Sequence, residues 1–216
     1  TQDAIDHAFS FFQPPAYEAQ DAATAQSALD DKCLSDPSFA AWIKHNVVAH
    51  KQPGYAAVNL SLKETGVAPG DITAEQMEAV ADLCERYGFG ELRSTHQQNL
   101  VLPDVRKADL YALWQELQTH RMASAVIGTL NDIICCPGGD FCSLANAKSI
   151  PVAEAIQRRF DDIDYLYDLG EIELNISGCM NACGHHHIGH IGILGVDKKG
   201  QEFYQVSLGG SQSNDA

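Results

Sequence analysis

Cys136-Pro-Gly-Gly-Asp-Phe-Cys142 and, further along the chain, Cys179-Met-Asn-Ala-Cys183 are the two stretches that organise this sequence. The first pair of cysteines has the spacing C-x5-C, and the second has C-x3-C. Thiolates are soft ligands that select zinc, copper(I) or iron–sulfur clusters. Structural zinc sites favour tighter knuckles, whereas a 4Fe–4S cluster needs four converging thiolates and N–H donors to its sulfides. The spacing therefore favours an iron–sulfur cluster, with zinc or unliganded cysteines as alternatives.

Glycines flank the second pair, and their lack of a side chain lets other backbone approach closely at Gly178 and Gly184. If a helix starts at Met180, Cys179 and Cys183 share one face of its first turn. The free N–H groups of such a helix start would point at negative charge.

Two cysteines are adjacent at the start of the first pair, so only one is expected to point toward a metal. Cys136 directly precedes Pro-Gly and is the expected ligand. Cys135 is then expected to be a small buried residue.

The composition bounds the class of protein. The chain has 216 residues, 45% of them hydrophobic, and a formal net charge of -15. That charge argues against nucleic-acid binding, which depends on clustered Lys and Arg. No apolar run approaches the roughly 20 residues that span a bilayer, and no signal peptide is recognisable. Seven cysteines without a secretory signal fit reduced, metal-binding thiols in the cytoplasm better than disulfides.

The chain divides into an N-terminal arm or linker with short helices (1–46), a first folded region (47–121) and a second one that carries the cysteines (122–216). The chain begins at Thr1 rather than Met, so we expect it to be trimmed, processed or cut from something longer. Alternation and spacing predict an α+β fold. The elements expected in 1–121 are helices at 20–32 and 38–46, a strand at 55–62, a helix from the capping box Thr73–Gln76 to Gly88, strands at 91–95 and 99–102, and a helix at 107–118.

The helix after the capping box is expected to bury one face made of Met77, Val80, Cys84 and Tyr87, which follow at spacings of three and four. In the second region we expect a buried extended stretch at 125–134 and a helix from Ser149 to about Phe160 with Pro151 in its first turn. Strands are expected at 171–176, 188–196 and 202–208, and the tail from Gly209 reads as frayed.

The cysteine stretches also resemble a known signature. Cys136-Pro-Gly-Gly-Asp-Phe-Cys-Ser-Leu-Ala145 followed by Ser177-Gly-Cys-Met-Asn-Ala-Cys-Gly184 is similar to that of the sirohaem-containing nitrite and sulfite reductases. Leu92-Arg-Ser-Thr-His-Gln-Gln-Asn-Leu100 resembles their half-ferredoxin repeat. The resemblance covers roughly residues 47–210. It implies a half-ferredoxin-like α/β unit followed by a mixed α+β half-domain for a 4Fe–4S cluster and sirohaem.

The resemblance also implies site residues, cofactors and their roles. The cluster ligands would be Cys136, Cys142, Cys179 and Cys183. Cys183 would also bridge to the sirohaem iron, so that cluster and haem act as one electronic unit. Asn181 and the backbone of Ala145 would lie against the sirohaem.

Two features depart from the family pattern. Met180 stands where the family usually has Pro after the third cysteine, a change that a flexible side chain should tolerate. Family members also contain two such units in one chain, whereas only the cluster-bearing second unit is recognisable here. The basic residues that clamp sirohaem and substrate come mainly from the first unit. Arg93 occupies a matching place, where we expect a structural role, with a cofactor contact as the alternative.

The expected function is that of the C-terminal, cluster-bearing half of an assimilatory sirohaem-dependent sulfite reductase, which reduces sulfite to sulfide with six electrons. The alternatives are nitrite reduction to ammonia, a non-catalytic metal or iron–sulfur electron-transfer module, and a sirohaem-dependent corrinoid-pathway monooxygenase. The expected partners are the N-terminal half of the same reductase, a ferredoxin or flavoprotein donor and a small anionic substrate, with no nucleic acid and no membrane. Alone, the chain is expected to be inactive.

Overall fold

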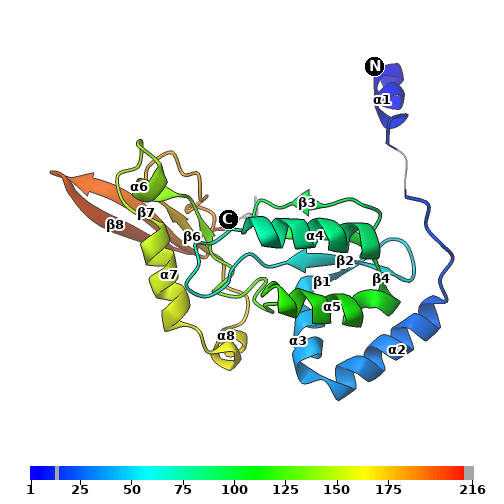
Figure 1. The fold of residues 1–216 in the computed structure, drawn as a ribbon. Coiled ribbons are helices and arrows are strands. Elements are labelled where there is room, and N and C mark those ends of the chain that lie inside the picture. The colour runs from blue at the N-terminus through cyan, green and yellow to red at the C-terminus, as the bar shows by residue number, and fades with distance from the viewer. Residues whose placement is uncertain (13–14, 212–216) are drawn as a thin grey trace.

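The computed structural model describes residues 1–12 and 15–211, whose strands form two four-stranded sheets (Figure 1). The fold is α+β, as the sequence predicts. Each sheet has its own apolar core, one built on residues 29–122 and the other on residues 126–193. The first core also contains Leu29, Phe39 and Trp42, which belong to the segment 1–46 that was expected to be an arm or linker.

Three helices precede the first sheet: α1 (Gln2–Phe9), α2 (Ala22–Ser35) and α3 (Pro37–Asn46). Helix α1 buries no residue. Asp36 caps α3 by accepting N–H bonds from its first turn, and Pro37 occupies the first helical position, where its missing N–H costs nothing. Phe39 and Trp42 of α3 are stacked and fully buried. Leu29 of α2 is buried in the same core.

The first sheet is antiparallel throughout, in the order β1-β2-β4-β3. Its strands are β1 (Val47–Ala49), β2 (Tyr55–Leu60), β3 (Arg93–Ser94) and β4 (Leu100–Arg106). The helices are α4 (Ala74–Tyr87), the short 3-10 helix η1 (Lys107–Asp109) and α5 (Leu110–Thr119). Both bonds of the predicted capping box are present at Thr73 and Gln76.

The buried face of α4 differs from the expected one. Met77 is 53% exposed, whereas Val80, Leu83 and Cys84 are buried. The first turn of α4 extends past the core, so burial begins one turn later than the spacing of the apolar residues implies. The expectation for Met77 was wrong.

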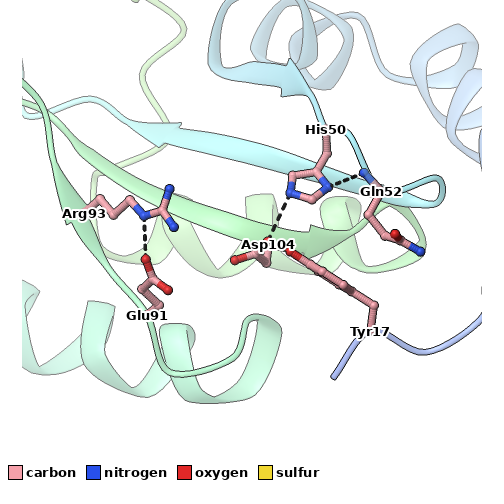
Figure 2. A network of polar contacts seen from close by, with 6 residues as sticks. All are labelled: Tyr17, His50, Gln52, Glu91, Arg93 and Asp104. Atoms are coloured by element: carbon pink, nitrogen blue, oxygen red, sulfur yellow. Dashed lines mark hydrogen bonds and ion pairs between the residues drawn. The ribbon is translucent and has the colours of Figure 1, made fainter. Parts of the chain in front are cut away.

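The chain N-terminal to α2 is tied to the first sheet by a polar network (Figure 2). The Tyr17 hydroxyl donates to Oδ1 of the buried Asp104 at 2.7 Å. His50 Nε2 lies 3.1 Å from the same oxygen, and the N–H of Gln52 donates to His50 Nδ1 at 2.9 Å. Because Nδ1 accepts, the neutral ring carries its proton on Nε2 and donates it to Asp104. The network anchors this segment through one buried carboxylate.

The second sheet is mixed, in the order β5-β6-β7-β8. Its strands are β5 (Ile134–Cys135), β6 (Leu174–Ser177), β7 (Ile191–Lys198) and β8 (Gln201–Leu208). β5 and β6 are parallel, as are β6 and β7, while β7 and β8 form an antiparallel hairpin. Its helices are α6 (Gly138–Phe141), α7 (Ile150–Arg159) and α8 (Ile163–Leu169). Helix α7 and the last two strands confirm their predictions to within a few residues.

Two segments of the second region were not foreseen. Residues 125–134 do not form an extended stretch, because turns closed by Val126, Thr129 and Asp132 occupy most of it. Helix α8 has no sequence prediction, although Asp162 caps it and Gly170 ends it with a positive φ. In the described part of the chain, no helix is both long enough and apolar enough to cross a membrane.

Candidate metal centre

The first cysteine of each pair directly follows a parallel strand of the second sheet. Cys136 follows β5, and Cys179 comes two residues after the end of β6. Parallel neighbours bring their carboxyl ends to the same edge of a sheet, and the register pairs Cys135 with Ile176. Cys136 and Cys179 are buried at 9% and 8% exposure. The sheet therefore brings the two cysteine loops together.

Backbone hydrogen bonds join these two loops. The N–H groups of Asn146 and Ala147 both donate to the carbonyl of Gly178, at 2.9 and 3.1 Å. The N–H of Cys136 donates to the carbonyl of Ile176 at 3.1 Å. The loops are thus one structural unit even though the chain separates them.

The flanking glycines are required by close contact, as expected. A Cβ on Gly178 would lie 2.7 Å from the carbonyl oxygen of Ala147, and a Cβ on Gly184 would lie 2.0 Å from that of Ile176. Both distances are shorter than any side chain tolerates. The two loops approach each other this closely at Gly178, and the second loop folds back on β6 at Gly184, only because these two positions carry no side chain.

The second pair does not start a helix. The N–H of Ala182 donates to the carbonyl of Cys179, and the N–H of His185 donates to that of Ala182, which forms successive turns. Ala182 and His185 have φ values of 56° and 53°, a left-handed conformation that a helix cannot contain. Met180 therefore starts no helix, and the condition under which Cys179 and Cys183 would share one helix face is not met.

The four expected ligands are all free thiols but differ in exposure: Cys136 and Cys179 are buried, Cys142 is half-buried and Cys183 is exposed. Within residues 1–12 and 15–211, no three His, Cys, Asp or Glu side chains are placed to hold a metal ion together. The structure thus joins the loops that carry the cysteines without gathering the four sulfurs. Ala145 is half-buried beside the first pair, and Asn181 is exposed beside the second.

The sulfur atoms of Cys136 and Cys135 have different hydrogen-bond partners, and burial keeps the Cys135 thiol neutral. The N–H of Gly178 donates to Cys136 Sγ at 3.1 Å. Burial, with the nearby Cys136 as a smaller cause, raises the pKa of the Cys135 thiol to about 12. Cys135 is 3% exposed and points its sulfur at the carbonyl of Cys136. A free-thiol set with an N–H donor on a buried sulfur fits the chemistry of an iron–sulfur cluster.

One residue of this centre was missed as a functional candidate. Ser149 was assigned only to the start of a helix, but its hydroxyl lies 3.6 Å from Cys136 Sγ. The sequence offered the signal of a helix-capping serine. It gave no sign that the hydroxyl would turn away from the helix.

Basic side chains near the cysteines are engaged at the surface. Lys148 lies 3.4 Å from Asp140, and Arg158 pairs with Glu154. Arg93 is 61% exposed and pairs with Glu91 (Figure 2). The loops also expose apolar side chains, with Phe141, Leu144 and Met180 all more than two-thirds exposed.

Both regions of the chain match models of known protein families. Residues 49–120 match the nitrite/sulfite reductase ferredoxin-like half domain, and residues 128–216 match the nitrite and sulphite reductase 4Fe-4S domain. The chain belongs to the family of nitrite and sulfite reductases. Its second region is therefore an iron–sulfur domain of oxidoreductases.

Relatives of both kinds match at similar identity. The chain is 31% identical to a chloroplastic ferredoxin–nitrite reductase of Zea mays over 77% of its length, and 33% identical to a ferredoxin sulfite reductase of Mycobacterium tuberculosis over 76%. These matches cover 29% and 31% of the two relatives. The chain thus spans less than a third of the length of the curated relatives it matches.

Solved structures give the same result. The NirA protein of Mycobacterium tuberculosis is 30% identical, with a TM-score of 0.63 over 80% of this chain and 32% of NirA. A dissimilatory sulfite reductase, DsrI, is 19% identical with a TM-score of 0.52 over 67% of this chain and 34% of its own, a likeness of fold alone.

Proposed function

We propose that this chain is the cluster-bearing half of a sirohaem-dependent reductase that converts sulfite to sulfide. The observation that carries the proposal is the pair of joined cysteine loops, in which the Gly178 N–H already donates to the sulfur of Cys136. Nitrite is the second candidate substrate, because nitrite reductases match this chain as closely as sulfite reductases do.

The four cysteines that would hold the 4Fe–4S cluster are Cys136, Cys142, Cys179 and Cys183. When bound, the cluster and sirohaem supply single-electron storage and a site for stepwise reduction of a small anion. Cys183 is exposed at the surface, where its thiolate can reach a haem iron held by another unit. Asn181 and the backbone of Ala145 lie beside the two pairs and would contact the same haem.

The proposed partners follow from what this chain lacks. Clamping an anionic substrate and the haem carboxylates needs cations, but the basic side chains near the cysteines pair with acids and the chain carries a net charge of -15. We assign the missing cations to the N-terminal half of the same reductase. We assign ferredoxin as the electron donor, which the names of the relatives support, with a flavoprotein as the second candidate. We place the protein in the cytoplasm, where thiols stay reduced.

The first test is cofactor content. The chain is produced without oxygen and analysed for iron, acid-labile sulfide and zinc. The proposal expects equal amounts of iron and sulfide, as a 4Fe–4S cluster contains. Stoichiometric zinc without iron would instead show a structural metal site. Cluster absorption that never acquires sirohaem bands, even with the N-terminal half present, would favour an electron-transfer module.

The second test is activity. With reduced methyl viologen as donor, we expect neither sulfite nor nitrite reduction by residues 1–216 alone, and reduction of sulfite once the N-terminal half is supplied. Turnover by the isolated chain would contradict the assignment of the cationic residues to another unit. Turnover of nitrite in preference to sulfite would favour the second candidate.

A further inference from the structure

Ser149 lies where the two cysteine loops meet helix α7. It is fully buried and precedes the first residue of α7. A serine in this position ordinarily accepts an N–H bond from the helix, but the Ser149 side chain makes no such bond. Its Oγ lies instead 3.6 Å from Cys136 Sγ, within reach of a hydrogen bond to the larger sulfur atom. The hydroxyl is therefore directed at an expected cluster ligand rather than at its own helix.

Two glycines, one from each cysteine loop, make room for this hydroxyl. A Cβ on Gly138 would lie 2.5 Å from Ser149 Oγ, and a Cβ on Gly178 would lie 3.0 Å from it. Gly138 follows β5 and Gly178 follows β6. The start of α7 and both cysteine loops thus meet at Ser149 Oγ. The two loops approach this atom with glycines, Gly138 and Gly178, which have no side chain.

The direction of the hydrogen bond follows from the chemistry of the ligand. A cysteine that binds iron is a thiolate and has no proton to donate, so the Ser149 O–H must be the donor. The Gly178 N–H also donates to Cys136 Sγ, at 3.1 Å. Hydrogen bonds to the cysteine sulfurs help to set the reduction potential of a cluster. Donors favour the reduced form, because it is more negatively charged.

We propose that Ser149 is a positioning residue of the cluster, whose hydroxyl donates to Cys136 Sγ and, together with the Gly178 N–H, raises the potential at which the cluster accepts an electron. The proposal rests on the proposed function, because it takes Cys136 as a ligand. It goes further in assigning a role to a residue outside the cysteine signature.

The test is a redox titration of the cluster-loaded protein, followed by electron paramagnetic resonance. Ser149→Ala removes the donor and should shift the reduction potential to a more negative value. Ser149→Thr keeps the hydroxyl and should titrate like the wild type. Ser61→Ala is the matched control, because Ser61 is equally buried, its Oγ has no hydrogen-bond partner and it lies in the other core region. An unchanged potential in Ser149→Ala would overturn the proposal.

A second measurement covers the case in which Ser149→Ala fails to hold a cluster. Wild-type protein is reconstituted in H2O and in D2O, and electron–nuclear double resonance counts the exchangeable protons coupled to the cluster near Cys136. Two donors are expected, one amide and one hydroxyl, and an amide alone would overturn the proposal. Wild-type protein that binds no cluster at all would instead refute the proposed function, and this inference with it.

Discussion

Cys135 and Cys136 are neighbours in the chain with opposite electrostatic surroundings. Burial raises the pKa of the Cys135 thiol to about 12, whereas Cys136 Sγ accepts the Gly178 N–H. We expect Cys136→Ala to lose most of its iron and Cys135→Ala to keep it, because Cys136 Sγ accepts an N–H bond from the second cysteine loop, whereas Cys135 points its sulfur at the carbonyl of Cys136. Iron and acid-labile sulfide per chain after anaerobic reconstitution measure this. Equal iron retention in the two variants would contradict the assignment.

Lys63 is a buried amine that makes stability depend on pH. It is 2% exposed and donates to the carbonyls of Gln97 and Gln98. Burial lowers its pKa from 10.5 to about 8, although Asp132 and Cys135 oppose the shift. Between these two values the unfolded chain binds more protons than the folded one, so stability should rise as pH increases through this window.

The change expected across that window is roughly 3 kcal/mol, at about 1.4 kcal/mol for each pH unit. Lys63→Met should flatten the rise, because no amine remains to titrate. Urea unfolding at several pH values between about 7 and about 10 measures how the free energy of unfolding changes with pH. The exposed Lys51→Met serves as the control and should keep the wild-type slope. If the unfolding free energy of Lys63→Met rises with pH as steeply as that of the wild type, another group is responsible.

The capping box of α4 stabilises the start of this helix and also connects it to the end of α5. Thr73 and Gln76 bond each other's backbone N–H groups, and Gln76 Nε2 also donates to the carbonyl of His120 after α5. Thr73→Ala should cost about 1 kcal/mol of unfolding free energy. Gln76→Ala should cost more, since it also removes the bond between α4 and the end of α5. Chemical unfolding measures both, with the exposed Glu78→Ala as a control on the same helix. Equal losses at the two positions would contradict the added role of Gln76.

Strand β8 leaves an exposed apolar edge on the second sheet. All eight of its residues are exposed, Val206 at 60% and Leu208 at 77%. Exposed apolar edge strands pair readily with other chains. We propose that the other half of the reductase covers this surface, so the isolated chain should self-associate as its concentration rises.

Light scattering across a concentration series measures this association. The double variant Val206→Lys and Leu208→Lys should shift the chain toward monomer. Gln205→Lys adds a charge on the opposite face of the strand and should have a smaller effect. A wild-type chain that stays monomeric at every concentration would contradict the prediction.

The sequence alone predicted those features that depend on residues close together in the chain. Alternation placed β2, and the capping box placed the start of α4. Each of these features depends on residues within a few positions of one another. The resemblance of the cysteine signature gave the family, which the domain matches confirm.

Other features depend on contacts between distant segments, and these only the tertiary structure decided. Met77 lies outside the core because the first turn of α4 extends past it. Asp132, in the turns at 125–134, accepts a hydrogen bond from the side chain of Asn99, which lies in the first region of the chain. Ser149 reaches Cys136 because parallel pairing of β5 and β6 brings two loops onto one helix start. The sequence by itself determined which residues have the chemistry of a metal site, and the pairing of strands far apart in the chain decided which of them meet.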